Sequence, residues 1–184
     1  MLLWLSGCQT TTLSTTWKDP SVASLSFNRM AVVVLNSSPA ERRAQEDTFA
    51  GGMTKVKAVP SYSFIPDELL KDTAKAKQRV IDGGFDGALI VRLVDTRQET
   101  SYVPPSVSTW DDGWSWVEPS YHVTPGYTVT DTFIRAEISL YSVPSGKLLW
   151  SGASETMNPS NARAFAGEVA KATANELRKQ GMIH

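Results

Sequence analysis

The hydrophobic positions of the chain fall into short runs that turn-forming residues separate. Residues 29–35 form a valine-rich run that is apolar at almost every position, which is typical of a strand buried on both faces of a sheet. Residues 86–94 are similar, whereas residues 132–141 alternate apolar and polar side chains, as a strand with one face in water does. Residues 148–156 follow the turn at 143–147, and we expect them to pair with the alternating strand.

Three segments carry the start and stop signals of helices: residues 39–52, 66–82 and 161–180. The first has the clearest start, because Ser38 and Glu41 have the spacing of a capping box and Pro39 occupies the first helical position. The third ends at Gly181, a residue suited to the turn after a helix. Each segment has an apolar stripe that can pack on a sheet.

Residues 56–64 are a further strand candidate, in which Pro60 has no N–H to donate and therefore belongs at a sheet edge or a bulge. The elements follow one another as β-α-β-α-β-β-β-α. This order predicts a single α/β (α+β) domain over residues 29–184, built in two or three layers from a mixed sheet of about five strands and three helices.

Composition narrows the function classes. The 184 residues, 41% of them hydrophobic, suit one folded domain. Eighteen basic and nineteen acidic residues give a net charge of -1, which argues against a basic nucleic-acid surface. The single cysteine, Cys8, rules out internal disulfides and thiolate clusters, and two histidines, His122 and His184, leave little material for zinc. We therefore expect no cofactor, no metal site and no nucleic-acid partner.

The residues Leu5-Ser6-Gly7-Cys8 resemble the lipobox of bacterial lipoproteins. The resemblance implies cleavage before Cys8, a thioether-linked lipid on its thiol and a further acyl chain on its amine, which together anchor a protein stably. Residues 1–7 would then be the remnant of a signal peptide; the segment has no positive charge and few apolar residues, so we expect the true start upstream. The alternative is a chance apolar N-terminus with a buried cysteine.

Residues 8–28 are predicted to be a lipidated tether. The segment after Cys8 is uncharged, rich in Ser and Thr, and has no periodicity, so it offers little apolar surface to offset the entropy of ordering. Twenty extended residues would reach roughly 65 Å. By resemblance to Gram-negative lipoproteins, the non-aspartate residue Gln9 implies sorting to the outer membrane.

Three short segments carry a wider resemblance: Trp17-Lys18-Asp19-Pro20, Glu46-Asp47, and the stretch from Gly146 to Gly152. They resemble uncharacterised bacterial envelope lipoproteins, a family of unknown function. The element order is similar to that of the periplasmic α/β domain of curli-secretion-type and Tol-associated proteins. The resemblance implies a compact lipoprotein domain and transfers no catalytic residues.

The common catalytic spacings are absent from the sequence, including the Gly-x-Ser-x-Gly elbow, the P-loop and the His-Glu-x-x-His helix. Glu46 and Asp47 are adjacent, so on a helix they diverge by about 100° and form no working pair. We expect them on a solvated helix face, with at most one inward contact. The basic residues Lys71, Lys75, Lys77 and Arg79 fit either a solvated face or an anionic contact.

The most unusual segment is residues 102–131, a predicted loop that is rich in aromatic residues, proline and glycine. Loops of this length are usually functional or mobile, and large aromatic rings often anchor interfaces. The candidate binding residues are Trp110, Trp114, Trp116 and Tyr121. Three interpretations stay open: the rings form a satellite core, they bind a partner or ligand, or they contact a membrane. Trp150 is expected in the core, and His122 at the surface.

The sequence supports three hypotheses of function. The first is a non-enzymatic, lipid-anchored lipoprotein on the periplasmic face of the outer membrane, which acts in the cell envelope through protein contacts. The second is a glycan- or ligand-binding module that uses the Trp-rich loop. The third is a hydrolase with an unfamiliar site, which would need convergent carboxylates near a serine or histidine.

Overall fold

A computed structural model describes residues 11–22, 26–110 and 120–183. The elements in chain order are β1 (Thr11–Lys18), β2 (Arg29–Leu35), α1 (Pro39–Gly52), β3 (Lys57–Pro60), the short 3₁₀ helices η1 (Ser61–Ser63) and η2 (Asp67–Lys71), α2 (Thr73–Asp82), β4 (Gly87–Val103), β5 (Ser106–Trp110), β6 (Ser120–Thr124), β7 (Tyr127–Ser142), β8 (Leu148–Met157) and α3 (Ala162–Lys179).

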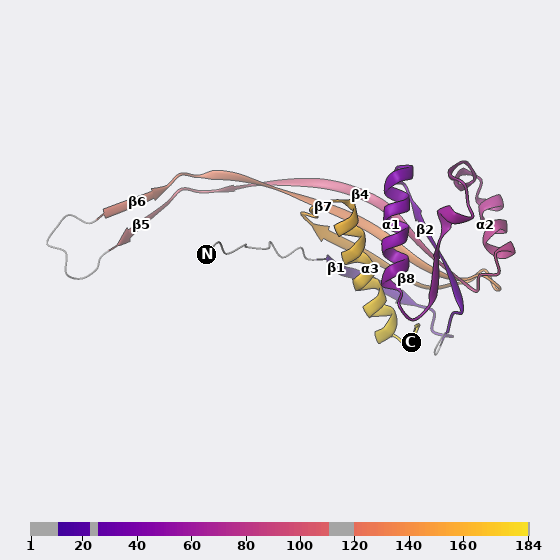
Figure 1. Cartoon of the computed structure of the whole chain (residues 1–184). Helices are drawn as coiled ribbons and strands as arrows, with labels where there is room; N and C mark the ends of the chain where they lie inside the picture. Colours follow the sequence, from indigo (N-terminus) through magenta and orange to yellow (C-terminus); the bar gives the residue numbers. More distant parts are fainter. Residues whose placement is uncertain (1–10, 23–25, 111–119, 184) are drawn as a thin grey trace.

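Six strands form one mixed sheet in the order β1-β8-β7-β4-β2-β3. The strand β2 runs parallel to β3 and β4, and the remaining neighbours are antiparallel. The helices α1 and α3 lie side by side on one face, and α2 lies at one end of the other (Figure 1). The predicted α+β class with a mixed sheet is confirmed, and the sheet has six strands where about five were expected.

The main core lies between the sheet and the pair α1 and α3. The side chains of Met30 and Val32 belong to it, while Ala31, between them, belongs to a second cluster with Val80 of α2. Both faces of β2 are therefore buried, as its continuous apolar run predicts. Trp150 is fully buried in the main core, as expected, and a Cβ on Gly152 would lie 2.6 Å from its ring.

Local signals in the sequence place the helix ends well. The Ser38 hydroxyl accepts a hydrogen bond from the Glu41 backbone N–H, and the Glu41 carboxylate accepts one from the Ser38 N–H, which completes the capping box. Gly181 has φ 69° directly after α3. Pro60 ends β3, a four-residue strand at the edge of the sheet. The predicted helix over 66–82 is instead split into η2 and α2, since Asp72 caps a new start by accepting from the Lys75 N–H.

Residues 11–18 form a strand rather than part of an unstructured tether. The strand β1 pairs antiparallel with β8, from Thr11 opposite Thr156 to Lys18 opposite Trp150. Thr-rich segments fit the pleated, half-exposed surface of a sheet, and backbone pairing along a sheet edge needs no apolar periodicity. The structure thus corrects the tether of residues 8–28 over this part of its length.

The segment 102–131 is not a structureless loop where the structure describes it. The strands β4 and β7 continue far beyond the core as an antiparallel pair, up to Val103 opposite Tyr127, and β5 and β6 extend them as a second pair. The result is a long two-stranded ribbon that projects from the domain (Figure 1). Pro104, Pro105 and Pro125 lie at the junction between the two pairs, where they have no N–H to donate to a ladder.

Candidate functional site

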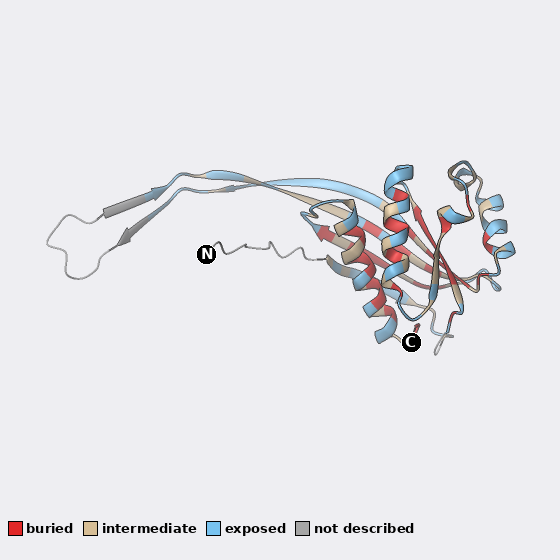
Figure 2. Cartoon of the chain, viewed as in Figure 1, coloured by how far each residue is buried: buried red, intermediate tan, exposed pale blue. Residues whose placement is uncertain are grey.

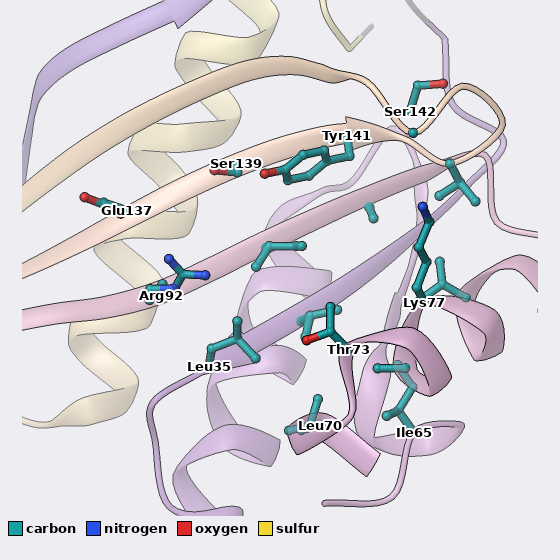
Figure 3. Close-up of a pocket in the computed structure, with 17 residues that line it drawn as sticks. Leu35, Ile65, Leu70, Thr73, Lys77, Arg92, Glu137, Ser139, Tyr141 and Ser142 are labelled. Carbon is teal, nitrogen blue, oxygen red and sulfur yellow. The ribbon is translucent and has the colours of Figure 1, made fainter.

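Two features of the described chain are candidates for function: a cavity against the sheet and the projecting ribbon (residues 94–110 and 120–133). The cavity, of about 460 Å³, lies between the second face of the sheet and the η2–α2 segment. One side is apolar and is formed by Val33, Leu35, Ile65, Leu70, Val80 and Ile90. The other side follows β7 and carries Glu137, Ser139 and Tyr141. Figure 3 shows this division between apolar and polar walls.

The charged side chains of the cavity lie at its two ends. Lys77 reaches from α2 towards the β7–β8 turn, where its Nζ lies 3.9 Å from the position of a Cβ built on Gly146. Arg92 lies at the other end, directly opposite Glu137 in the β4–β7 ladder. Figure 3 shows the Arg92 guanidinium turned towards the middle of the cavity and the Glu137 carboxylate turned away from it. Within the described residues, neither cation makes an ion pair or a hydrogen bond.

A buried ionic cluster fixes the apolar wall of this cavity. Arg42 and Glu46 on α1 are 2% and 0% exposed, and Arg42 Nε donates to Glu46 Oε1 at 2.9 Å. Glu46 also accepts hydrogen bonds from the Val34 N–H, the Ser61 hydroxyl and the Tyr62 N–H. The four donors satisfy the carboxylate in a buried setting where an unpaired charge is costly. The cluster ties α1 to β2 and η1.

The same arginine holds the start of η2. Arg42 Nη1 donates to Asp67 Oδ1 at 2.5 Å, and Arg43 donates to the other oxygen of that carboxylate at 3.0 Å. Mainly because of the hydrogen bond from Arg42, the pKa of Asp67 lies below its ordinary value. Asp67 therefore stays ionised at neutral pH, and it connects α1 to the η2 segment that carries Leu70 into the cavity wall.

This cluster corrects the expectation that Glu46 and Asp47 share a solvated helix face. Asp47 is exposed, as expected, and accepts a hydrogen bond from the Tyr62 hydroxyl at 2.8 Å. Glu46 is instead fully buried among several donors. The signal that could have located it is the i, i+4 spacing of Arg42 and Glu46 on the apolar side of the helix.

The ribbon carries most of the exposed apolar side chains of the described chain. Of the eight large hydrophobic residues that are exposed there, five lie on the ribbon: Val94, Tyr102, Val107, Val123 and Tyr127. Figure 2 shows the ribbon exposed along most of its described length, in contrast to the buried strands of the domain. Exposed tyrosine and valine side chains along a projecting element are accessible to a partner.

The structure locates two of the four predicted aromatic binding residues. Trp110 ends β5 and is paired with Ser120, while Tyr121 of β6 is paired with Thr109. Both therefore lie at the far end of the described ribbon. Trp114 and Trp116 lie outside the described residues, as does Cys8. The roles assigned to all five residues stay predictions.

The two histidines are not among the residues that line the cavity. His122 belongs to β6 and His184 lies outside the described residues. The described residues contain no group of three or more His, Cys, Asp or Glu side chains that could hold a metal ion. Glu137 is the single carboxylate of the cavity, so the cavity lacks the paired acids that the hydrolase hypothesis requires. Within the described chain, no helix is both long and apolar enough to span a membrane.

Comparison with known proteins finds solved structures that are similar to this chain at low sequence identity. No family model and no curated protein matches the chain. The chain is similar to PelC from Paraburkholderia phytofirmans, a dodecamer, with a TM-score of 0.43 and 16% identity over 95% of this chain and 100% of that chain. A PelC point variant gives a TM-score of 0.46 and 14% identity, over 90% and 96% of the two chains. Lipoprotein GNA1162 from Neisseria meningitidis has a TM-score of 0.43 and 16% identity, over 82% of this chain and 98% of that chain.

The buried cluster yields a first test. We expect Glu46→Ala to lower the free energy of unfolding by about 3–5 kcal/mol, because it leaves the buried Arg42 without one of its carboxylates. The matched control is Asp47→Ala, which removes the neighbouring exposed carboxylate and should change stability by less than about 1 kcal/mol. Guanidinium unfolding measures both. Equal losses for the two variants would contradict the structural role of Glu46.

Proposed function

We propose that this chain is a lipid-anchored lipoprotein on the periplasmic face of the outer membrane. In this proposal it acts without catalysis, as an interaction component of the cell envelope, and the ribbon is the element that binds its partner. The anchor is an acyl group on Cys8. The observation that carries the proposal is the position of β1 relative to the ribbon.

The register of the sheet supports this arrangement. Thr11, the first residue of β1, is opposite Thr156 of β8, which is itself opposite Ile134 of β7. Ile134 in turn pairs with Thr96 on β4, at the root of the ribbon. Thr11 therefore lies at the end of the sheet from which the ribbon projects.

The same register shortens the predicted tether. Cys8 precedes Thr11 by three residues, which span roughly 10 Å at most. A tether of twenty extended residues would instead reach roughly 65 Å. An acyl group on Cys8 would hold the ribbon end of the domain close to the lipid headgroups. The ribbon would then extend from the membrane-proximal end of the protein, where envelope partners are within its reach.

The side chains of the ribbon favour contact with a protein over burial in lipid. One face carries Gln98 with Thr100 and Thr130, and the other carries Glu99 opposite Asp131. Neither face has the continuous apolar stripe that hydrocarbon requires. Scattered exposed tyrosines and valines among hydroxyl groups are instead typical of protein-binding surfaces.

A glycan ligand is the second candidate function. Trp110 and Tyr121 lie at the far end of the described ribbon, and Trp114 and Trp116 lie between them in the sequence. Such aromatic side chains offer flat amphipathic surfaces against which sugar rings can pack. Peptidoglycan is the envelope glycan that this candidate proposes.

The anchor is tested by removing its thiol. We expect Cys8→Ser to abolish incorporation of a labelled fatty acid and to move the protein from the membrane fraction to the soluble periplasmic fraction, since serine forms no thioether. Thr10→Ser is the matched control and should change neither result. Unchanged membrane fractionation and retained label in Cys8→Ser would refute the anchor.

The ribbon is tested separately with Trp114→Ala combined with Trp116→Ala. We expect loss of the cross-linked complexes that the native protein forms in intact cells, with the melting temperature unchanged within about 2–4 °C. Trp17→Ala is the control, because this tryptophan is 46% exposed on β1, away from the ribbon.

The same variants distinguish the two candidate functions. Loss of sedimentation with purified peptidoglycan, while the protein complexes persist, would favour the glycan candidate. A drop in melting temperature of about 10 °C or more would show that the two rings belong to a satellite core, and it would overturn the binding role.

A further inference from the structure

The cavity between the sheet and α2 has the properties of a binding site that is separate from the ribbon. Its volume of about 460 Å³ falls in the range of small-molecule sites, which are mostly apolar with a few placed polar groups. We propose that this cavity binds a single acyl chain with an anionic head group. The proposal does not depend on the anchor or on the ribbon.

The apolar wall fits the acyl chain. Leu35 from β2 and Leu70 from η2 line the cavity together with Ile65, which is 1% exposed. The floor runs along β4 from Ala88 to Arg92, a distance of about 13 Å for four residue-to-residue steps of a strand. An extended acyl chain of medium length would cover this wall and remove its apolar surface from water.

Small side chains on both sides keep this space open. Ala76 lines it from α2, and Ala88 and Ser139 line it from the sheet. Larger side chains at these positions would fill the volume. Protein interiors are usually packed without such space. The cavity therefore results from residue size at a few positions, and a single substitution can close it.

Charge places the head group at the Lys77 end. Lys77 has no ionic partner within the described chain, and the neighbouring turn carries a second lysine, Lys147. At the other end, Arg92 lies opposite Glu137, so the positive charge of one residue is offset by the negative charge of the other. The net positive charge of the cavity therefore lies at the Lys77 end, where the ammonium can pair with a carboxylate or phosphate while the chain extends towards Leu35.

Calorimetry tests the proposal with the full chain carrying Cys8→Ser, so that neither a lipid nor a detergent competes. The probes are decanoate and decyl phosphate, with decanol, decyltrimethylammonium and inorganic phosphate as comparisons. We expect saturable binding of one decanoate or decyl phosphate per chain, binding at least about tenfold weaker for decanol and decyltrimethylammonium, and none for phosphate alone. Tighter binding of one anionic probe than the other would identify the preferred head group.

Matched variants locate the site. Lys77→Gln should weaken decanoate binding about tenfold, whereas Lys71→Gln, at an exposed position outside the cavity, should leave it unchanged. Ala76→Phe should abolish binding by filling the cavity, and Ala74→Phe, on the exposed side of the same helix, should not. Ser139→Leu closes the cavity from the sheet and replaces Ala76→Phe if that variant does not fold.

Three results would overturn the proposal. One is the absence of saturable decanoate binding at millimolar concentration. Another is equal affinity for decanoate and decanol. The last is unchanged decanoate binding in a folded variant whose cavity is filled.

Discussion

The backbone pairing between β4 and β7 is the interaction on which the rest of the structure depends. The same two strands cross the centre of the sheet and then continue into the ribbon. A two-stranded ribbon alone is marginally stable in water, so its base in a six-stranded sheet is what holds it in place. At the root, Arg97 pairs with Glu155 of β8 at 3.0 Å and stacks over Phe133 at 4.7 Å.

The two faces of the sheet differ in what covers them. The face under α1 and α3 contains most of the core and supplies most of the stability through apolar burial. The other face is covered by α2 at one end, where the cavity lies. The Arg42 cluster connects the two, because it joins α1 in the first layer to Asp67 at the start of η2. A buried ion pair of this kind contributes to positioning more than to net stability.

The sequence was informative where one local signal decides the structure. The capping box at Ser38, the edge position of Pro60 and the turn at Gly181 depend on backbone chemistry within a few residues, and each prediction is confirmed. The mixed α+β sheet followed from the continuous and alternating apolar runs. Trp150 in the core followed from its place in a hairpin strand.

The features that the sequence did not predict depend on contacts between residues that are far apart in the sequence. The strand β1 is ordered by pairing with β8, about 140 residues later, and its Thr-rich sequence has no apolar alternation to reveal it. The ribbon was missed for the same reason, since both of its faces are exposed and no burial pattern marks the strands. Three of the four donors to Glu46 lie on β2 and η1, far from it in sequence. The cavity arises because α2 covers one end of a face.

The central claim is that the ribbon serves binding while the domain supplies stability. Thermal unfolding of a shortened chain tests it most directly, with an Asn-Gly turn in place of residues 98–132, so that Arg97 and Phe133 remain opposite each other across a two-residue hairpin. We expect a cooperative transition with a melting temperature within about 4 °C of that of the full chain. A melting temperature lower by about 10 °C or more, or loss of the cooperative transition, would contradict it.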